Sequence, residues 1–493
     1  MRISVRKFAA LTVGVLTTSL LVAGPAFAGK TTAEGAPEAA TSTSLNLLWI
    51  ILGAVLVIFM QAGFALVETG FCRAKHAAHV VSTNFAIFGL GMVGFFLIGF
   101  PLMFGGYSYP GVFGMDKAIG SNLIGSGDWV FLWKGPLALS GKGYDVGVVA
   151  FFLYMVAFMD TTATIPTGSL AERWKWKSFV VWGLFCGAIY YPIFGAWTWG
   201  GGWLSQLGDS LKLGHGYVDF AGSGVVHAVG GMAALAGAIV LGPRIGKFGP
   251  DGKPRVIPGH HIPMAMLGTF ILLFGWFGFN AASTFSAMDN RFAMAAVNTA
   301  IAAAFGATAA MVILMYTGAK KPDPGMMANG MLAGLVAITA PCAFVAPWAA
   351  AVIGIVAAVL VIVAVPFFEK LGIDDPVGAI SVHGVNGIWG VISVGLFADG
   401  TYGKAWNALD RQWTKDHGVT GLFYGGEGAK QLLAQTIGAV VLMTVILGLA
   451  YAFFFIQNKV TKGGIRSTEA DELEGLDLGE MGVLAYPEFA LSK

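Results

Sequence analysis

Charged residues are scarce in this chain. Only 11% of its 493 residues are Asp, Glu, Lys or Arg, and 56% are hydrophobic. A soluble globular domain carries about 25% charged residues. Most of the chain is therefore expected to lie out of contact with bulk water. The formal net charge of +2 gives no basic footprint for nucleic acid.

Cysteines and familiar catalytic motifs are also few or missing. Cys72, Cys186 and Cys342 lie far apart and form no C-x-x-C pair, which favours neither a disulfide framework nor a zinc site. The sequence has no H-E-x-x-H zinc motif, no phosphate-binding loop and no Ser/His/Asp order typical of hydrolases. It predicts no enzyme activity, no metal and no cofactor.

The first 28 residues have the pattern of an export signal. Three basic residues lie within the first seven positions, an apolar run follows over 8–24, and Ala26-Phe27-Ala28 fits a small-x-small cleavage site. We expect residues 1–28 to be removed, which would leave the new N-terminus outside the cytoplasm. An uncleaved first helix is the alternative.

The remaining hydrophobic residues form runs long enough to cross a bilayer. The apolar core of a membrane is about 30 Å thick, which roughly 20 helical residues span. Eleven runs of this kind follow the signal, and they predict an all-α membrane protein. They lie near 46–71, 80–105, 145–168, 178–199, 218–242, 262–284, 292–317, 326–344, 347–367, 378–398 and 432–457.

The basic residues between these runs predict the orientation of the chain. With the N-terminus outside, the short outer loops hold only Lys212 and Arg291. This distribution follows the positive-inside rule and places the C-terminus in the cytoplasm. The inner loops hold Arg73, Lys75, Arg173, Lys175, Lys177, Arg244, Lys247, Lys253, Arg255, Lys320, Lys321 and Lys370.

Two segments resemble each other and point to a site. Asp219 precedes His227 by eight positions, and Asp375 precedes His383 by eight. Each His is the second residue of the pattern Val-His-small-Val-x-Gly. The segments begin the fifth and tenth expected helices, which run in opposite directions. This arrangement is typical of an inverted repeat of helices 1–5 and 6–10, whose site lies near the midplane of the membrane.

Helix geometry brings the two histidines together. Eight residues at about 1.5 Å each place a His about 12 Å below its Asp, and the two aspartates start from opposite faces of a core about 30 Å thick. The imidazoles of His227 and His383 should therefore approach each other near mid-membrane. A conduction or proton-handling pair is favoured over packing histidines or a metal site, because a buried polar pair needs a role and no third metal ligand lies nearby in sequence.

Four further stretches accompany the repeat: Gly-Ser-Leu-Ala-Glu-Arg at 168–173, Trp-Gly-Gly-Gly at 199–202, Gly-Trp-Phe-Gly-Phe-Asn-Ala-Ala-Ser at 275–283, and 374–390 around the second His. Together they make the sequence resemble the ammonium transporter / Rhesus protein family, and within it the bacterial ammonium transporters. The resemblance covers nearly the whole chain after the signal. It implies a transmembrane transport domain over 29–457, a homotrimer with one pore through each subunit, and a location in the bacterial inner membrane.

The resemblance also implies roles for single residues. Trp199 and Ser283 would recruit ammonium or methylammonium at the outer mouth, with the acid Asp219 below them. Phe158 and Phe279 would form a stacked gate. His227 and His383 would conduct ammonia, with the proton either left behind or relayed. An ammonium sensor and a Rhesus-like channel for neutral gas are the alternatives, and the aromatic Trp199 favours a cation over a gas.

The C-terminal tail, 458–493, is polar and acidic. By resemblance, Arg466, Glu474 and Asp477 in this tail belong to a docking element for a PII-type signalling protein, or to contacts within the trimer.

Two acids within the expected helices, Glu68 and Asp160, match no residue of the shared conduction motif. An intramembrane acid is a functional candidate, but a structural role, including one at a subunit contact, is favoured for both.

Overall fold

A computed structural model gives the fold and describes residues 38–107, 113–114, 117–317 and 320–489. The expected signal peptide, 1–28, lies outside the described residues. Within them, ten helical segments are long and apolar enough to cross a membrane, and Pro324–Thr339 is a shorter apolar helix. The predicted all-α membrane fold is therefore confirmed, with ten of the eleven predicted membrane helices long enough to span and the eleventh, near 326–344, a shorter apolar helix.

The helix bounds agree with the apolar runs to within a few residues, except that the first helix starts earlier. Several membrane segments consist of two helices joined by a wider π-helical turn, so the labels outnumber the segments. The main elements are α2 (Glu38–Phe71), α3 (Ala77–Gly94), α4 (Phe100–Phe104), α5 (Val146–Ser169), α6 (Trp176–Phe185), α7 (Tyr191–Trp197), α8 (Leu207–Ser210), α9 (Val229–Leu241), α10 (Ile262–Ala281), α11 (Arg291–Tyr316), α12 (Pro324–Thr339), α13 (Pro347–Lys370), α14 (Asn386–Phe397), α15 (Gln412–Asp416), α16 (Gly428–Val441), α17 (Leu447–Val460) and α18 (Glu469–Glu474).

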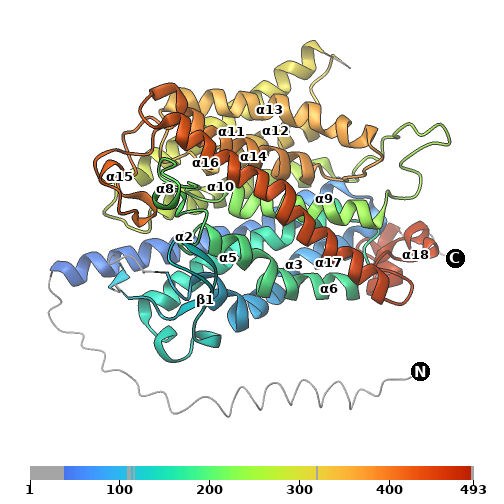
Figure 1. Ribbon diagram of the computed structural model, residues 1–493. Coiled ribbons are helices and arrows are strands. Elements are labelled where there is room, and N and C mark those ends of the chain that lie inside the picture. The colour runs from blue at the N-terminus through green and yellow to red at the C-terminus, as the bar shows by residue number, and fades with distance from the viewer. Residues whose placement is uncertain (1–37, 108–112, 115–116, 318–319, 490–493) are drawn as a thin grey trace.

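The helices form one bundle with two different ends (Figure 1). One end, the hairpin face, carries α8, α15 and a two-stranded hairpin, β1 (Ser121–Ser126) and β2 (Trp129–Lys134). The other end, the tail face, carries α18 and the rest of the C-terminal tail. Large apolar side chains such as Leu267, Phe274 and Val363 are exposed along the outer helices, as expected for surfaces that contact lipid.

The hairpin is the one β-sheet within the described residues, and the all-helical prediction lacked it. Its strands pair antiparallel, with Ser126 opposite Trp129. Two bonds hold it on the bundle: the Trp203 amide donates to the Val130 carbonyl over 3.0 Å, and Trp197 Nε1 donates to the Phe131 carbonyl over 2.9 Å. It lies outside the membrane helices, in the segment between α4 and α5.

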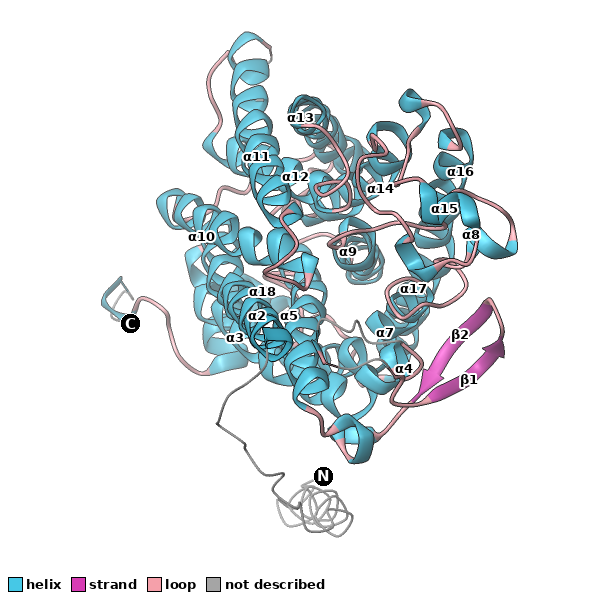
Figure 2. Ribbon diagram, turned by 90° about the vertical axis from the view of Figure 1, so that its left-hand side faces the viewer, coloured by secondary structure: helices cyan, strands magenta, loops and turns pink. Residues whose placement is uncertain are grey.

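The two repeated segments lie at the centre of the bundle, where Figure 2 shows α9 surrounded by the other helices. In each segment a glycine with positive φ, Gly222 (112°) or Gly378 (81°), precedes a π-helical turn. The two turns are Ser223–Ala228 and Ile380–Val385. Each turn carries the repeat's histidine. π-Helical turns are rare and concentrate at functional sites.

Small residues allow these two segments to touch backbone to backbone. A Cβ atom added to Gly231 would overlap with the backbone nitrogen of Gly384, so the crossing point depends on glycine at 231. This close approach brings the histidines of the two halves within reach of each other.

Replacing Gly231 with leucine is therefore expected to lower the free energy of unfolding by at least about 3 kcal/mol, because overpacking against rigid backbone cannot be relieved by a rotamer change. Thermal unfolding and size-exclusion chromatography in detergent would measure this. Gly448 on α17 is the matched control, because an added Cβ there meets no atom of the described chain within 4 Å. Equal stability of Gly231→Leu and Gly448→Leu would contradict the tight crossing.

Candidate functional site

A cavity of about 700 Å³ lies at the hairpin face and narrows into the bundle. We call it the vestibule. Its lining includes Phe158, Trp199 and Ser283, three of the residues that the sequence predicted for an outer site and gate. The structure thus gathers residues from α5, from the loop after α7 and from the end of α10 around one cavity.

Asp219 holds Trp199 in place at the vestibule. Trp199 Nε1 donates to the Asp219 carbonyl over 2.7 Å. The Asp219 carboxylate accepts the amides of Gly222 (2.8 Å), Gly224 (2.9 Å) and Val225 (2.9 Å) at the start of the π-helical turn. A carboxylate is well placed there, since backbone N–H groups at a helix start lack partners. This geometry favours a positioning role for Asp219, with its charge behind Trp199, over direct contact with a ligand.

Ser283 shares its surroundings with a tyrosine that the sequence analysis did not name. The Ser283 hydroxyl donates to the Phe279 carbonyl over 2.8 Å, and its oxygen lies 3.1 Å from Tyr154 Oη. Tyr154 precedes Phe158 by four residues and therefore lies on the same face of α5, a spacing that could have identified it. The Ser283 oxygen keeps acceptor capacity for a donor in the vestibule.

Two phenyl rings close the floor of the vestibule. The rings of Phe158 and Phe279 are stacked, with centroids 4.1 Å apart and an interplanar angle of 30°. Phe158 also meets the Trp199 ring edge-on at 5.8 Å. Both phenylalanines are buried, and only Phe158 lines the vestibule.

The histidines meet directly below the stacked rings. His227 Nδ1 lies 3.1 Å from His383 Nδ1, and the ring centroids are 5.2 Å apart. A hydrogen bond between two Nδ1 atoms requires one to carry the proton and the other to accept, so the neutral rings are opposite tautomers. The sequence prediction that the two repeats bring these side chains together is confirmed.

His227 has two aromatic neighbours, both from α10. Its centroid lies 5.4 Å from Phe279 and 5.1 Å from Trp276, which stacks at 19°. Trp276 Nε1 donates to Thr339 Oγ1 over 2.8 Å, which fixes the indole. His227 Nε2 is buried and has no hydrogen-bond partner within the described chain. Trp276 lies inside a motif quoted above, but spacing alone did not indicate that it faces His227.

A second, much smaller cavity lies beyond His383. Its volume is about 20 Å³, and its lining includes Phe64, Glu68, Val377 and His383. We call it the inner cavity. The order of side chains from the vestibule is therefore Trp199, Phe158, Phe279, His227, His383 and the inner cavity.

Comparison with known proteins identifies the family. A model described as the Ammonium Transporter Family matches residues 48–486. The chain belongs to the ammonium transporter family. It is 44% identical over 485 residues to ammonium transporter Amt2 of Archaeoglobus fulgidus, covering 98% of this chain and 96% of that one. It is 34% identical to ammonium transporter 1 member 3 of Solanum lycopersicum, covering 91% and 94%.

Solved structures agree. A chain titled Sensor Amt Protein has a TM-score of 0.75 and 35% identity, with 89% of this chain and 99% of that chain covered. Mep2 of Candida albicans has a TM-score of 0.70 and 27% identity, with 90% and 91% covered. This protein is thus a helical, multi-pass membrane protein with an ammonium transporter's function, as the resemblance implied.

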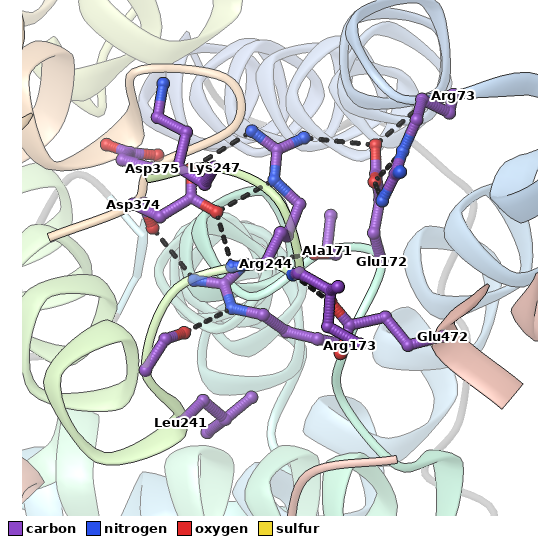
Figure 3. Close-up of polar contacts among 12 residues, drawn as sticks. Arg73, Ala171, Glu172, Arg173, Leu241, Arg244, Lys247, Asp374, Asp375 and Glu472 are labelled. Carbon is purple, nitrogen blue, oxygen red and sulfur yellow. Dashed lines mark hydrogen bonds and ion pairs between the residues drawn. The ribbon is translucent and has the colours of Figure 1, made fainter. Parts of the chain in front are cut away.

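The tail face of the transporter holds a buried network of charges (Figure 3). Arg244 binds Asp374 through Nε at 2.8 Å and Glu172 through Nη1 at 3.1 Å. Arg73 also pairs with Glu172, donating from Nε over 2.6 Å. Burial opposes ionisation of Asp374, but Arg173 and Arg244 outweigh it and hold the pKa of this carboxyl well below its usual range. Burial likewise acts to raise the pKa of Glu172, but its charged neighbours, Arg244 first among them, together lower it.

The C-terminal tail docks onto this network. Arg466 pairs with Glu472 at 2.7 Å and donates to the Leu241 carbonyl over 3.0 Å. Asp477 accepts the His79 amide over 2.8 Å, whereas Glu474 is exposed. Of the three tail residues named from the sequence, the structure therefore places Arg466 and Asp477 in contacts within the chain and leaves Glu474 exposed. Glu472, which pairs with Arg466, was not named.

Proposed function

We propose that this transporter recruits the ammonium cation in the vestibule and moves ammonia and a proton separately past the histidine pair. The column of side chains from Trp199 to the inner cavity carries this proposal. A bare cation cannot enter an apolar passage, because removing an ion from water costs many kcal/mol. When the rings at the floor of the vestibule swing aside, the cation meets His227 and loses its proton there, which leaves a neutral molecule that can pass.

Trp199 and Ser283 supply the recruitment site. An indole face attracts a cation, and the Ser283 oxygen can accept one of its N–H bonds. The Phe158 and Phe279 rings exclude water from the interior and must swing aside for passage. Because both rings also contact other aromatic side chains, each passage displaces a well-packed pair.

The tautomers of the histidine pair define a balanced proton path. With His227 donating from Nδ1, its Nε2 is bare and takes up the ammonium proton. The Nδ1 proton of His227 then passes to His383 Nδ1, and His383 releases its own proton from Nε2. One proton enters and one leaves, both rings end in exchanged tautomers, and the pair must reset before the next cycle.

We further infer the setting of the transporter from its charge distribution. Lys and Arg gather in the loops of the tail face, which by the positive-inside rule is cytoplasmic, with the hairpin face on the periplasmic side of a bacterial inner membrane. The exposed apolar helices suit lipid and the neighbouring subunits of a homotrimer. The docked tail, with Glu474 exposed, is available to a PII-type partner.

Electrical recording on purified protein in liposomes tests the proposal. Ammonium is expected to evoke a current, and methylammonium to compete. Trp199→Leu should weaken apparent ammonium affinity by about 5- to 30-fold, since a cation–π contact contributes about 1–2 kcal/mol. Trp348→Leu is the control, because Trp348 is 56% exposed on the outer surface.

The outcomes separate the alternatives. Ammonia flux without any current would favour a neutral gas channel, and neither flux nor current would favour a sensor. A normal affinity in Trp199→Leu would remove the recruitment site while leaving transport itself intact.

A further inference from the structure

A buried acid, Glu68 on α2, lies at the inner end of the pathway, and the mechanism above does not use it. Its exposed fraction is 2%, and it lines the inner cavity together with His383. A carboxyl group within a membrane segment is costly and is a functional candidate when it meets a polar pathway. Glu68 does so, whereas the second buried acid, Asp160, is not among the residues that line the inner cavity.

Glu68 is held by two polar side chains. Asn84 Nδ2 donates to its Oε2 over 2.7 Å. Thr167 Oγ1 lies 2.9 Å from Oε1 and 2.8 Å from Oε2. The amide of Asn84 is itself oriented, because its Oδ1 accepts from Thr164 Oγ1 over 2.9 Å. These contacts fix the carboxyl group beside the cavity.

The Thr167 hydroxyl gives Glu68 a satisfied hydrogen-bond arrangement both with and without a proton. Thr167 Oγ1 lies 2.5 Å from the Thr164 carbonyl oxygen as well as near the carboxyl, and a hydroxyl has one proton to donate. When Glu68 is ionised, Thr167 donates to it. When Glu68 is protonated, the carboxyl donates to Thr167, which turns its own proton to the Thr164 carbonyl. Neither state leaves the buried carboxyl unpaired.

The inner cavity connects this carboxyl with the histidines. His383 Nδ1 faces His227, so Nε2 lies at the side of the ring away from that partner. The cavity volume of about 20 Å³ is enough for one water molecule, which needs roughly 10–15 Å³ of such volume. The rest of the lining is largely apolar, including Phe64, Val67 and Val382. Glu68, His383 and Asn329 are thus the polar residues that line a cavity with space for a single water.

We propose that Glu68 is the proton acceptor at the inner end of the histidine pair. The proposal rests on the relay described under the proposed function. The proton released from His383 Nε2 passes through one water to the Glu68 carboxylate, which becomes a neutral carboxylic acid. Glu68 then gives this proton to a water of the tail-side solution and returns to the carboxylate. One proton is taken up and one released, and ammonia crosses the same cavity unprotonated.

The test combines current and luminal pH in liposomes that carry a pH-sensitive dye. Glu68→Gln keeps the size of the side chain and can bond Asn84 and Thr167, but it cannot carry a proton. We expect its ammonium-evoked current to fall by at least about tenfold. Ammonia still enters without its proton and takes one from the lumen, so the lumen becomes more alkaline than with the wild type. Glu68→Asp, which keeps a carboxyl, should retain current.

Asp160→Asn is the matched control, a neutralised buried acid that leaves the wild-type current unchanged. Equal current in wild type and Glu68→Gln would overturn the role of Glu68 and leave the histidine relay unaffected. Loss of both current and luminal alkalinisation in Glu68→Gln and Glu68→Asp alike would reveal a structural role and also overturn it. A wild type without any ammonium-evoked current would instead remove the relay itself, and Glu68's role with it.

Discussion

Ammonium-evoked current is expected to fall by at least about 100-fold when His227 and His383 are both replaced by alanine. General acid–base groups contribute about 10²- to 10⁴-fold to proton transfer, and the 3.1 Å contact between the two Nδ1 atoms is the central step of the proposed proton path. Recording on liposomes with the purified variant measures the change. His417→Ala is the control, because this exposed histidine lies in a loop of the hairpin face.

The single variants make this expectation sharper. In a serial relay either histidine is indispensable, so His227→Ala and His383→Ala alone should each lose about as much current as the double variant, as groups that act as a unit are not additive. If the two histidines contributed independently, the fold-loss of current in the double variant would instead be the product of the two single losses. A current that survives in the double variant would mean that the proton crosses by another path, and the relay would have to be abandoned.

Much of this architecture follows from the sequence for simple reasons. Membrane helices are bounded by the thickness of the bilayer, so apolar runs of about 20 residues mark them, and little else in the chain has that length. The meeting of His227 and His383 follows from an equal spacing of eight residues after Asp219 and Asp375, combined with opposite helix directions. Neither inference needed any knowledge of packing.

The features that sequence left open all depend on packing. Trp276 stacks on His227 and Tyr154 contacts Ser283, but each is one aromatic among many on an apolar helix. The tail carries several acids of equal charge, and only its path along the tail face decides that Glu472 pairs with Arg466 while Glu474 does not. The role of Glu68 was likewise not predictable from sequence, because it depends on the cavity that Glu68 shares with His383.

Asp374 is expected to contribute more to stability than any other acid outside the membrane segments. Asp374→Asn should lower the free energy of unfolding by about 3–5 kcal/mol, because removing one partner of a buried ion pair leaves the other charge short of its counter-charge. Here the charge left behind is Arg244, whose side chain is 3% exposed. The acid that remains beside it, Glu172, is shared with Arg73. Asp251→Asn is the control: its ion pair with Lys253 is largely exposed, and such pairs contribute about 0–1 kcal/mol.

The pH dependence of unfolding gives an independent test of the same pair. The arginines lower the pKa of folded Asp374, whereas an unfolded Asp titrates near about 3.9. A group whose pKa is lower in the folded protein binds fewer protons there, so it stabilises the fold above the unfolded pKa and loses this contribution as the pH falls below it. Thermal unfolding in detergent from pH 7 to pH 3 should therefore show a steeper loss for the wild type than for Asp374→Asn below about pH 4. The two curves should approach each other toward pH 3 without meeting, because the pKa of folded Asp374 lies well below its usual range. Parallel curves would mean that Asp374 is not ionised and paired in the folded transporter, and the buried charge network could not then anchor the tail face as the structure indicates.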